Sequence, residues 1–360
     1  MDKAFDILFS SIRCALDGKA VDIQAVKSLS KTEWLELVKL AQQHNVMPLV
    51  CDGLAGLRRE LPAKVFARVA GLTIVAEDKY ESRVNVIKTI ASLMAENKIP
   101  LMVIKGYGVS LYYPQPNHRS FSDIDTYHFG QLEAADKVLK ERLGVDIDVD
   151  VHHHTTCVYQ GVLIENHYDF VNTSSHNSNA RFEKLLKAEA EKGCRRHRVG
   201  EQEIMLPSPM FNALFLMRHM ALHYAAERVS VRHLCDWKQF VEAEGENVDW
   251  ERVNKVYAEY NMKRFADAIT ALCIDHLGMK RDVVPGVERD AKLENRILND
   301  ILYAEFSEEK PEGLLRIVWW KTRRFFANRW KHKLVYNESW LWTFFQSSWA
   351  HLIKPKTITH

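Results

Sequence analysis

The chain has 360 residues, of which 47% are hydrophobic and 27% are charged, and its formal net charge is +2. This composition is that of a globular protein with room for more than one domain, and it excludes an intrinsically disordered chain. The near-neutral charge gives no general reason to expect a nucleic-acid partner. The six cysteines form no C-x-x-C pair, which argues against a zinc ribbon or a disulfide framework and favours a reducing compartment.

Membrane insertion and secretion are not expected from the sequence. No window approaches the ~18 uninterrupted apolar residues that a membrane-spanning helix needs. The N-terminal stretch MDKAFDILFSSIRCALDG is unlike a signal peptide, because Asp2, Asp6 and Arg13 interrupt its apolar run. We therefore expect a cytoplasmic protein, with peripheral membrane contact through residues 316–360 as the alternative.

The first part of the chain has the pattern of a helical segment. Ser30 and Glu33 have the spacing of a capping box, which predicts that a helix begins just after Ser30. Apolar residues then follow at helical intervals, and this pattern continues as far as Lys98. We therefore expect residues 1–85 to form an N-terminal helical segment.

The pattern changes at Ile99 to short apolar segments separated by glycine and proline. Pro114 and Pro116 should stop a short helix, and Gly144 should end a longer one. This order predicts a small mixed sheet with helices packed on it. The expected elements are a strand over 99–106, a short helix over 107–113, a strand over 121–129, a helix over 131–144, and two strands over 145–172 that turn near Gln160-Gly161.

From about Arg181 the sequence predicts mostly helices, one of which begins after the Ser-Pro pair at 208–209. The predicted fold class is α+β, with a small mixed-sheet core between N- and C-terminal helical segments. The predicted organisation is an N-terminal helical segment (1–85), the sheet core (86–175), a helical domain (176–310), and a basic, aromatic C-terminal segment (311–360).

Two carboxylates lie close together in the second predicted strand. Asp123 and Asp125 are two residues apart, so their side chains point to the same side of a strand. Two such anions raise each other's pKa unless a cation lies between them, and Mg²⁺ suits this place because it takes oxygen ligands. The other interpretation is a pair of solvated aspartates, which we prefer for the similarly spaced Asp146, Asp148 and Asp150.

The surroundings of Asp123 resemble those of an uncharacterised nucleotidyltransferase family in the DNA polymerase beta-like nucleotidyltransferase superfamily. The matching features are a strand that ends in Lys105-Gly106, the YYPQP segment, Arg119, the DID motif at 123–125 and the acid-x-His strand in GVLIENHYDF. The resemblance covers most of residues 30–240. A polymerase-beta-like nucleotidyltransferase core is therefore the expected fold of the sheet region.

This resemblance implies metal-dependent transfer of a nucleoside monophosphate from a nucleoside triphosphate (NTP) to an acceptor. The acceptor is a small molecule, a sugar or a protein. Asp123, Asp125 and Glu165 would be the catalytic, metal-holding residues, with two Mg²⁺ ions during catalysis. Asp169, four residues after Glu165, is the second choice for the third carboxylate. The alternative is a catalytically inactive protein that binds a nucleotide or a partner.

The resemblance also suggests which residues bind the nucleotide. The wider superfamily has Gly-Ser or Gly-Gly in the turn where this chain has Lys105-Gly106. Gly106 would bring backbone N–H groups close to a phosphate, and Lys105 would replace the missing hydroxyl as a point charge. Arg119 would either grip a triphosphate oxygen or pair with a surface acid.

Histidines near the predicted carboxylates raise the question of a zinc site. His152 and His154 share a strand face, and His167 could approach them across the hairpin. The sequence offers no convincing tetrahedral ligand set, so we expect His167 to orient Glu165 instead.

Two further features leave their interpretations open. Arg232 and Asp236, one helical turn apart, either form an intrahelical pair or contact the nucleotide or acceptor. Residues 316–360 hold six of the nine tryptophans, nine lysines and arginines, and Glu338 as their single acid. This segment suits packing on the body of the protein, an anionic membrane surface or nucleic acid. We favour packing, and nucleic acid is not expected as a partner.

Overall fold

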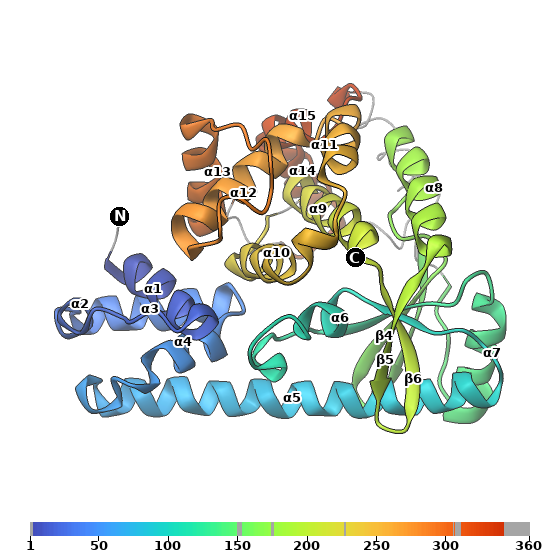
Figure 1. The fold of residues 1–360 in the computed structure, drawn as a ribbon, viewed down its shortest axis with the longest axis horizontal. Helices are drawn as coiled ribbons and strands as arrows, with labels where there is room; N and C mark the ends of the chain where they lie inside the picture. Colours follow the sequence, from blue (N-terminus) through green and yellow to red (C-terminus); the bar gives the residue numbers. More distant parts are fainter. Residues whose placement is uncertain are drawn as a thin grey trace.

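The structure, a computed structural model, describes residues 3–149, 153–173, 176–226, 228–304, 306 and 311–341. Figure 1 shows a mixed sheet at one end of a long helix, N-terminal helices at the other end, and a group of C-terminal helices above both. The predicted α+β class, with a mixed sheet between helical segments, is confirmed.

The N-terminal segment consists of short helices, as predicted. They are α1 (Lys3–Asp17), α2 (Ile23–Lys27), α3 (Lys31–Gln43) and α4 (Met47–Ala55). The predicted capping box is present at the start of α3. The Ser30 N–H donates to Glu33 Oε2 at 2.7 Å, and the Glu33 N–H donates to Ser30 Oγ at 3.3 Å.

Helix α5 (Ala63–Glu96) connects the N-terminal helices to the sheet and crosses residue 85, where we expected a border, without a break. Its first half packs against α3 and α4, and its second half packs under the sheet (Figure 1). Val86, Ile87 and Ile90 are buried in the core between this helix and the sheet. One helix thereby fixes the position of the N-terminal segment relative to the sheet.

The sheet has the strand order β3-β4-β2-β1-β6-β5. Within it, β2 runs antiparallel to β1 and parallel to β4, and β1 runs parallel to β6. Successive strand residues face opposite sides, so Met102 and Ile104 enter the core shared with the C-terminal helices while Val103 enters the core under α5. The strands are β1 (Met102–Ile104), β2 (Asp123–Tyr127), β3 (His154–Tyr159), β4 (Val162–His167), β5 (Cys194–Val199) and β6 (Gln202–Pro207).

Two strand predictions need correction. The hairpin β5–β6 lies in a region where we predicted helices. Its first strand has the charged sequence CRRHRV, which lacks the alternation of apolar residues by which a strand is recognised, because an edge strand with an exposed face does not need it. Strand β3 begins at His154 rather than at residue 145. Before it, Asp148 forms an isolated bridge with Thr156, and Asp146 and Asp148 are exposed, as expected for solvated residues.

The helices that follow each strand were mostly predicted. Helix α7 ends at Gly144, whose φ of 66° is the left-handed conformation expected of a glycine stop. Helix α9 (Pro209–Ala226) lies on the side of the sheet opposite α5, and α10 (Val231–Glu244) packs against α9, α12 and α6 (Figure 1). The remaining helices are α6 (Gly106–Ser110), α7 (Leu132–Leu143), α8 (Asn177–Lys192), α9 (Pro209–Ala226), α10 (Val231–Glu244), α11 (Trp250–Glu259), α12 (Lys263–Leu277), α13 (Ala291–Tyr303), α14 (Leu314–Ala327) and α15 (Arg329–Val335).

The described part of the C-terminal segment packs on the body of the protein. Val335 and Tyr336 are buried, and the guanidinium of Arg218 donates to the carbonyl oxygen of Val335 at 3.2 Å. The Ser178 N–H donates to Glu338 Oε1 at 2.7 Å. Residues 342–360, with Trp342, lie outside the described residues. No helix in the described ranges has both the length and the apolar character that crossing a membrane requires.

Candidate active site

Three predicted carboxylates come together on one face of the sheet. Strands β2 and β4 run side by side in parallel, and their register places Asp125 directly beside Glu165. Asp123 lies two residues before Asp125 and so faces the same side. Asp125 is buried, whereas Asp123 and Glu165 are partly exposed. The carboxylates of the two strands therefore gather at a single spot that solvent can reach.

Asp169, the second choice for the third carboxylate, lies elsewhere. It follows the end of β4, and its carboxylate accepts a hydrogen bond from the Lys187 ammonium at 2.5 Å. Glu165, by contrast, has an oxygen atom within 4.8 Å of ligand atoms of Asp125 and His167. The geometry thus favours Glu165 as the third acid.

Two cations converge on one oxygen atom of Asp125. The Lys105 ammonium lies 2.8 Å from Oδ1, and His167 Nε2 lies 2.9 Å from the same atom. His167 Nδ1 faces the carbonyl oxygen of Asp169 at 3.1 Å, so both ring nitrogens face acceptors. His167 therefore orients Asp125 most directly, and it approaches Glu165 Oε2 at 3.6 Å as well.

This arrangement sets the charges of the site. Burial alone would raise the pKa of Asp125, but Lys105 and His167 hold it well below its usual range. Burial and Lys105 lower the pKa of His167, but its hydrogen bonds with Asp125 and Glu165 outweigh them, so that the pKa is raised. Burial, and then the charges of Asp125 and Glu165, raise the pKa of Asp123. Asp125 is thus an anion held between two cations.

The turn before the carboxylates differs from our expectation in one respect. The residue with positive φ is Lys105 (φ 49°, ψ −124°), not Gly106, which begins α6. This conformation costs a non-glycine residue about 1–3 kcal/mol, and such strain persists where surrounding contacts impose it. Gly106 is needed for another reason, since an added Cβ atom would lie 3.0 Å from the Phe121 ring. The strained turn directs the Lys105 side chain to Asp125.

The donor atoms fit a divalent metal ion. Asp125, Glu165 and His167 have possible ligand atoms within 4.8 Å of one another, and Asp123 lies on the same strand face as Asp125. Carboxylate oxygens suit Mg²⁺, and the Lys105 ammonium places a positive charge beside Asp125. A second group of possible ligands, rich in nitrogen, consists of His153, His154 and His167, so the two groups share His167. The structure therefore contains a carboxylate-rich and a histidine-rich group of possible metal ligands that meet at one residue.

The histidine set differs from the one that we considered from the sequence. His153 lies beside His154 and His167, whereas His152 lies outside the described residues. Burial lowers the pKa of His153 to about 2, and burial likewise lowers the pKa of His154 to about 4. Both rings are therefore neutral near pH 7, which is the form that binds metal ions.

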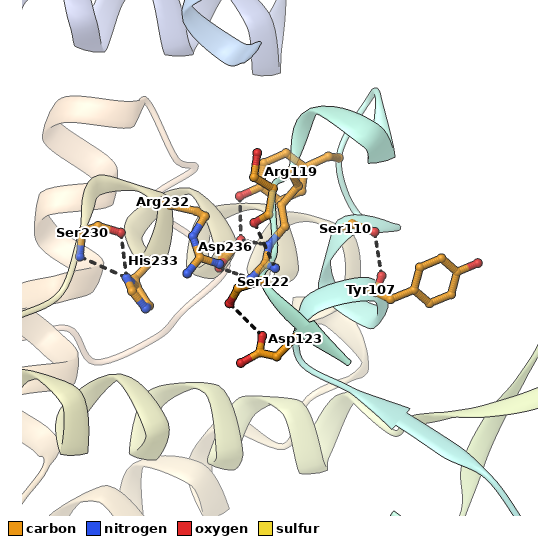
Figure 2. A network of polar contacts seen from close by, with 11 residues as sticks. Tyr107, Ser110, Arg119, Ser122, Asp123, Ser230, Arg232, His233 and Asp236 are labelled. Carbon is orange, nitrogen blue, oxygen red and sulfur yellow. Dashed lines mark hydrogen bonds and ion pairs between the residues drawn. The ribbon is translucent and has the colours of Figure 1, made fainter. Parts of the chain in front are cut away.

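Arg119 is held by a buried acid on helix α10. Its Nε donates to Asp236 Oδ1 at 3.0 Å and its Nη2 donates to Oδ2 at 2.7 Å, while the Tyr113 hydroxyl donates to Oδ1 at 2.7 Å. The intrahelical pair that we considered is also present, with Arg232 Nη1 3.5 Å from Asp236 Oδ2. Figure 2 shows both arginines converging on Asp236. This network joins α10 to the loop that leads into β2.

Two residues of the site were not found from the sequence. Ser122 Oγ donates to Asp123 Oδ1 at 3.1 Å, and Arg83 Nε donates to the carbonyl oxygen of Ser122 at 3.1 Å (Figure 2 shows Ser122 and Asp123). Arg83 belongs to α5, far from the Asp-x-Asp motif in the sequence, so no local pattern could indicate it. It adds a cation at the edge of the carboxylate site.

The mixed sheet thus carries an Asp-x-Asp strand with an acid on the parallel neighbouring strand. The chain belongs to the uncharacterised nucleotidyltransferase family, whose model matches residues 30–278, and the resemblance seen in the sequence is thereby confirmed. No curated protein matches the chain.

Solved structures show a distant likeness. A crystal structure of ANT(2")-Ia in complex with adenylyl-2"-tobramycin is 13% identical, with a TM-score of 0.35, over 49% of this chain and 96% of that chain. The solution structure of the antibiotic-resistance factor ANT(2'')-Ia has the same identity and TM-score, over 53% of this chain and 95% of that chain. An antigenic nucleotidyltransferase-like protein from Paracoccidioides brasiliensis is 16% identical, with a TM-score of 0.32, over 46% of this chain and 77% of that chain.

Proposed function

We propose that this protein transfers a nucleoside monophosphate from an NTP to an acceptor with the help of Mg²⁺. The observation that carries this proposal is the placement of Asp125 directly beside Glu165, with Asp123 on the same face. Three carboxylates on two rigid neighbouring strands can hold divalent ions against a triphosphate. Bound Mg²⁺ would activate the attacking hydroxyl group and stabilise the charge of the leaving pyrophosphate.

The residues of the chain have separate roles in this proposal. Asp123, Asp125 and Glu165 would hold the metal ions, and His167, hydrogen-bonded to Asp125, would keep that carboxylate ionised and in place. Lys105 supplies a fixed positive charge to the triphosphate, beside the N–H groups at the start of α6. These groups are positioned before substrate binds, so they cost little reorganisation during the reaction.

Arg119 acts through structure rather than by gripping a phosphate. The Arg119 guanidinium donates a hydrogen bond to Asp236, which also accepts one from the Tyr113 hydroxyl, and the Arg119 side chain is buried. It is therefore a positioning residue that keeps α10 beside the Asp-x-Asp strand.

The second candidate is a catalytically inactive protein that binds a nucleotide or a partner. The observation that favours it is the Lys105 ammonium, which occupies a cation position next to Asp125. If Lys105 replaces the metal ion instead of binding phosphate, the site can bind an NTP without reacting.

Release of pyrophosphate separates the two candidates. The full-length protein is incubated with Mg²⁺ and each of the four NTPs, with and without pools of hydroxyl-bearing small molecules, sugars and protein substrates. We expect pyrophosphate release that depends on the acceptor, a mass gain of one nucleoside monophosphate on the acceptor, and loss of both with a chelator. Binding of an NTP without pyrophosphate release for any acceptor would support the inactive candidate.

A further inference from the structure

A cavity of about 350 Å³ opens beside the carboxylate site. Its walls come from α3, α4, α5, the loop 120–122 and the single α10 residue Arg232. Ser122 lines this cavity and also donates a hydrogen bond to Asp123, so the cavity begins one residue away from the metal-holding carboxylates. Anything bound there would lie against the reacting centre.

The cavity carries positive charge. Lys79, Arg83 and Arg232 line it, and no carboxylate is found among the described residues of its wall. The Arg83 guanidinium donates hydrogen bonds to the carbonyl oxygens of Lys79 and Ser122, which are neutral groups, and Asp123 is the nearby acid that favours its charged form. An anion is the ligand that this wall would attract.

Arg232 adds to this charge because its acidic neighbour is already occupied. Asp236 accepts two hydrogen bonds from Arg119, so one carboxylate serves two guanidinium groups (Figure 2). The Arg232 side chain is four-fifths buried, and its Nε atom has no hydrogen-bond partner in the described structure. The Arg232 side chain nevertheless lines the cavity, so its guanidinium charge adds to the attraction of an anion.

Another part of the wall is apolar. Leu72 and Val75 of α5 and Met47 and Pro48 of α4 contribute to it, and Val75 is 48% exposed. An exposed aliphatic side chain in a concave surface gains stability when a ligand covers it. The ligand should therefore join an anionic group to an apolar or ring-shaped body.

We propose that this cavity, called here the acceptor pocket, binds an acceptor that carries a phosphate or carboxylate group beside its reacting hydroxyl. This inference rests on the proposed function. The acceptor oxygen forms a bond with the α-phosphorus of the NTP, the bond from that phosphorus to the bridging oxygen of the β-phosphate breaks, and pyrophosphate leaves. The hydroxyl proton passes to solvent.

The triphosphate of the NTP is the other anion that the site must bind, and the proposed function assigns it to the Lys105-Gly106 turn. The Phe121 ring lies next to Gly106, where an added Cβ atom would be 3.0 Å from it, and Phe121 also lines the acceptor pocket. Neither Lys105 nor Gly106 lines the pocket, so we expect nucleotide and acceptor to bind at the same time.

Binding of phenyl phosphate to the full-length protein tests this inference without any need for turnover. Calorimetric titrations are made with and without a saturating α,β-methylene NTP and Mg²⁺. We expect one phenyl phosphate per chain in both conditions, and no binding of the polycation spermine. Arg83→Gln and Lys79→Gln should each weaken binding about tenfold, because a charge-assisted hydrogen bond is lost. The matched control Lys64→Gln, on the same helix outside the pocket, should bind like the wild type.

The following results would contradict either the acceptor-pocket inference or the proposed function. Competition between phenyl phosphate and the NTP analogue would show that the pocket holds the triphosphate, and it would overturn the inference. An NTP analogue that binds while phenyl phosphate does not, or equal weakening by Lys64→Gln and Arg83→Gln, would also overturn it and leave the proposed function intact. Binding of phenyl phosphate without any binding of the NTP analogue would instead contradict the proposed function.

Discussion

The ammonium of Lys105 lies 2.8 Å from a carboxylate oxygen of Asp125, and Lys105 reaches it from a backbone conformation that side chains rarely adopt. The chain thus accepts backbone strain at a position that places a positive charge beside a candidate metal ligand. We therefore expect Lys105 to influence both the binding of metal ions and the binding of the triphosphate.

Replacement of Lys105 should change these two affinities in opposite directions. In Lys105→Met the carboxylates lose a compensating cation, so Mn²⁺ should bind the nucleotide-free protein more tightly, by several-fold, in a titration followed by electron paramagnetic resonance. NTP binding should weaken about tenfold, because a charge-assisted contact is lost. Lys105→Arg keeps the charge and is the control. Unchanged Mn²⁺ affinity in Lys105→Met would show that the ammonium does not compete for the metal position.

Glu165 and Asp169 should differ sharply in their importance. Glu165 lies beside Asp125 in the sheet, whereas Asp169 pairs with Lys187. Glu165→Gln should reduce turnover at least about a hundredfold through lost stabilisation of transition-state charge. Asp169→Asn should leave turnover within a few-fold of the wild type. Steady-state rates of the two variants test this prediction. If Asp169→Asn loses turnover while Glu165→Gln retains it, Asp169 and not Glu165 is the third acid.

His118 should make stability depend on pH. Its Nδ1 lies 2.6 Å from Asp52 Oδ2 and its Nε2 lies 2.7 Å from Glu77 Oε1, so both nitrogens must carry protons to donate. Burial lowers the pKa of His118, but the two acids outweigh burial and raise it. The stabilisation is then complete below the unfolded pKa of about 6.5 and is lost as pH rises through the higher folded pKa.

Denaturant unfolding at pH 6 and pH 9 measures this effect. The free energy of unfolding lost in His118→Gln should be larger at pH 6 than at pH 9. His44 is the control, because burial lowers its pKa to about 4 and the ring is neutral at both pH values. The unfolded ring of His44, with a pKa of about 6.5, is partly protonated at pH 6, so His44→Gln should cost less at pH 6 than at pH 9, the opposite of His118→Gln. A cost of His118→Gln that does not change with pH would mean that folding does not raise the pKa of His118.

The C-terminal segment should stabilise the body of the protein. A chain that ends near Pro311 lacks α14 and α15, and with them the buried residues Val335 and Tyr336. Each large buried side chain contributes roughly 1.5–3 kcal/mol, so the melting temperature should fall and the protein should aggregate. If the truncated chain instead melts like the full chain and has lost binding to anionic liposomes, the segment is a membrane contact.

Most of the carboxylate site can be predicted from the sequence, because short motifs within single strands indicate its residues. Asp123 and Asp125 share a strand face by their spacing alone, and Glu165 follows from the acid-x-His strand of the family. The pairing of Arg119 with Asp236 could not be predicted in the same way. These residues lie on different elements, and only the packing of α10 against the loop before β2 brings them together.

The acceptor pocket and the β5–β6 hairpin were missed for related reasons. The pocket combines residues of α3, α4, α5, a loop and α10, and no motif connects them. The hairpin lies at the sheet edge, where Arg196 is exposed and pairs with Glu203, so its charged pattern does not look like that of a strand. Tertiary packing, and not a local sequence pattern, determines both the pocket and the place of the hairpin in the sheet.

Turnover of Asp125→Asn, measured beside Asp123→Asn, tests the central claim most directly. The control is the pair Asp146→Asn and Asp148→Asn, which has the same spacing on an exposed segment. Once an acceptor is found, pyrophosphate release should fall at least about a hundredfold in both site variants and stay at the wild-type level in the control. Circular dichroism should show that both site variants are folded like the wild type. Wild-type release in a double Asp123→Asn, Asp125→Asn variant, or release that survives complete chelation of divalent ions, would contradict the central claim.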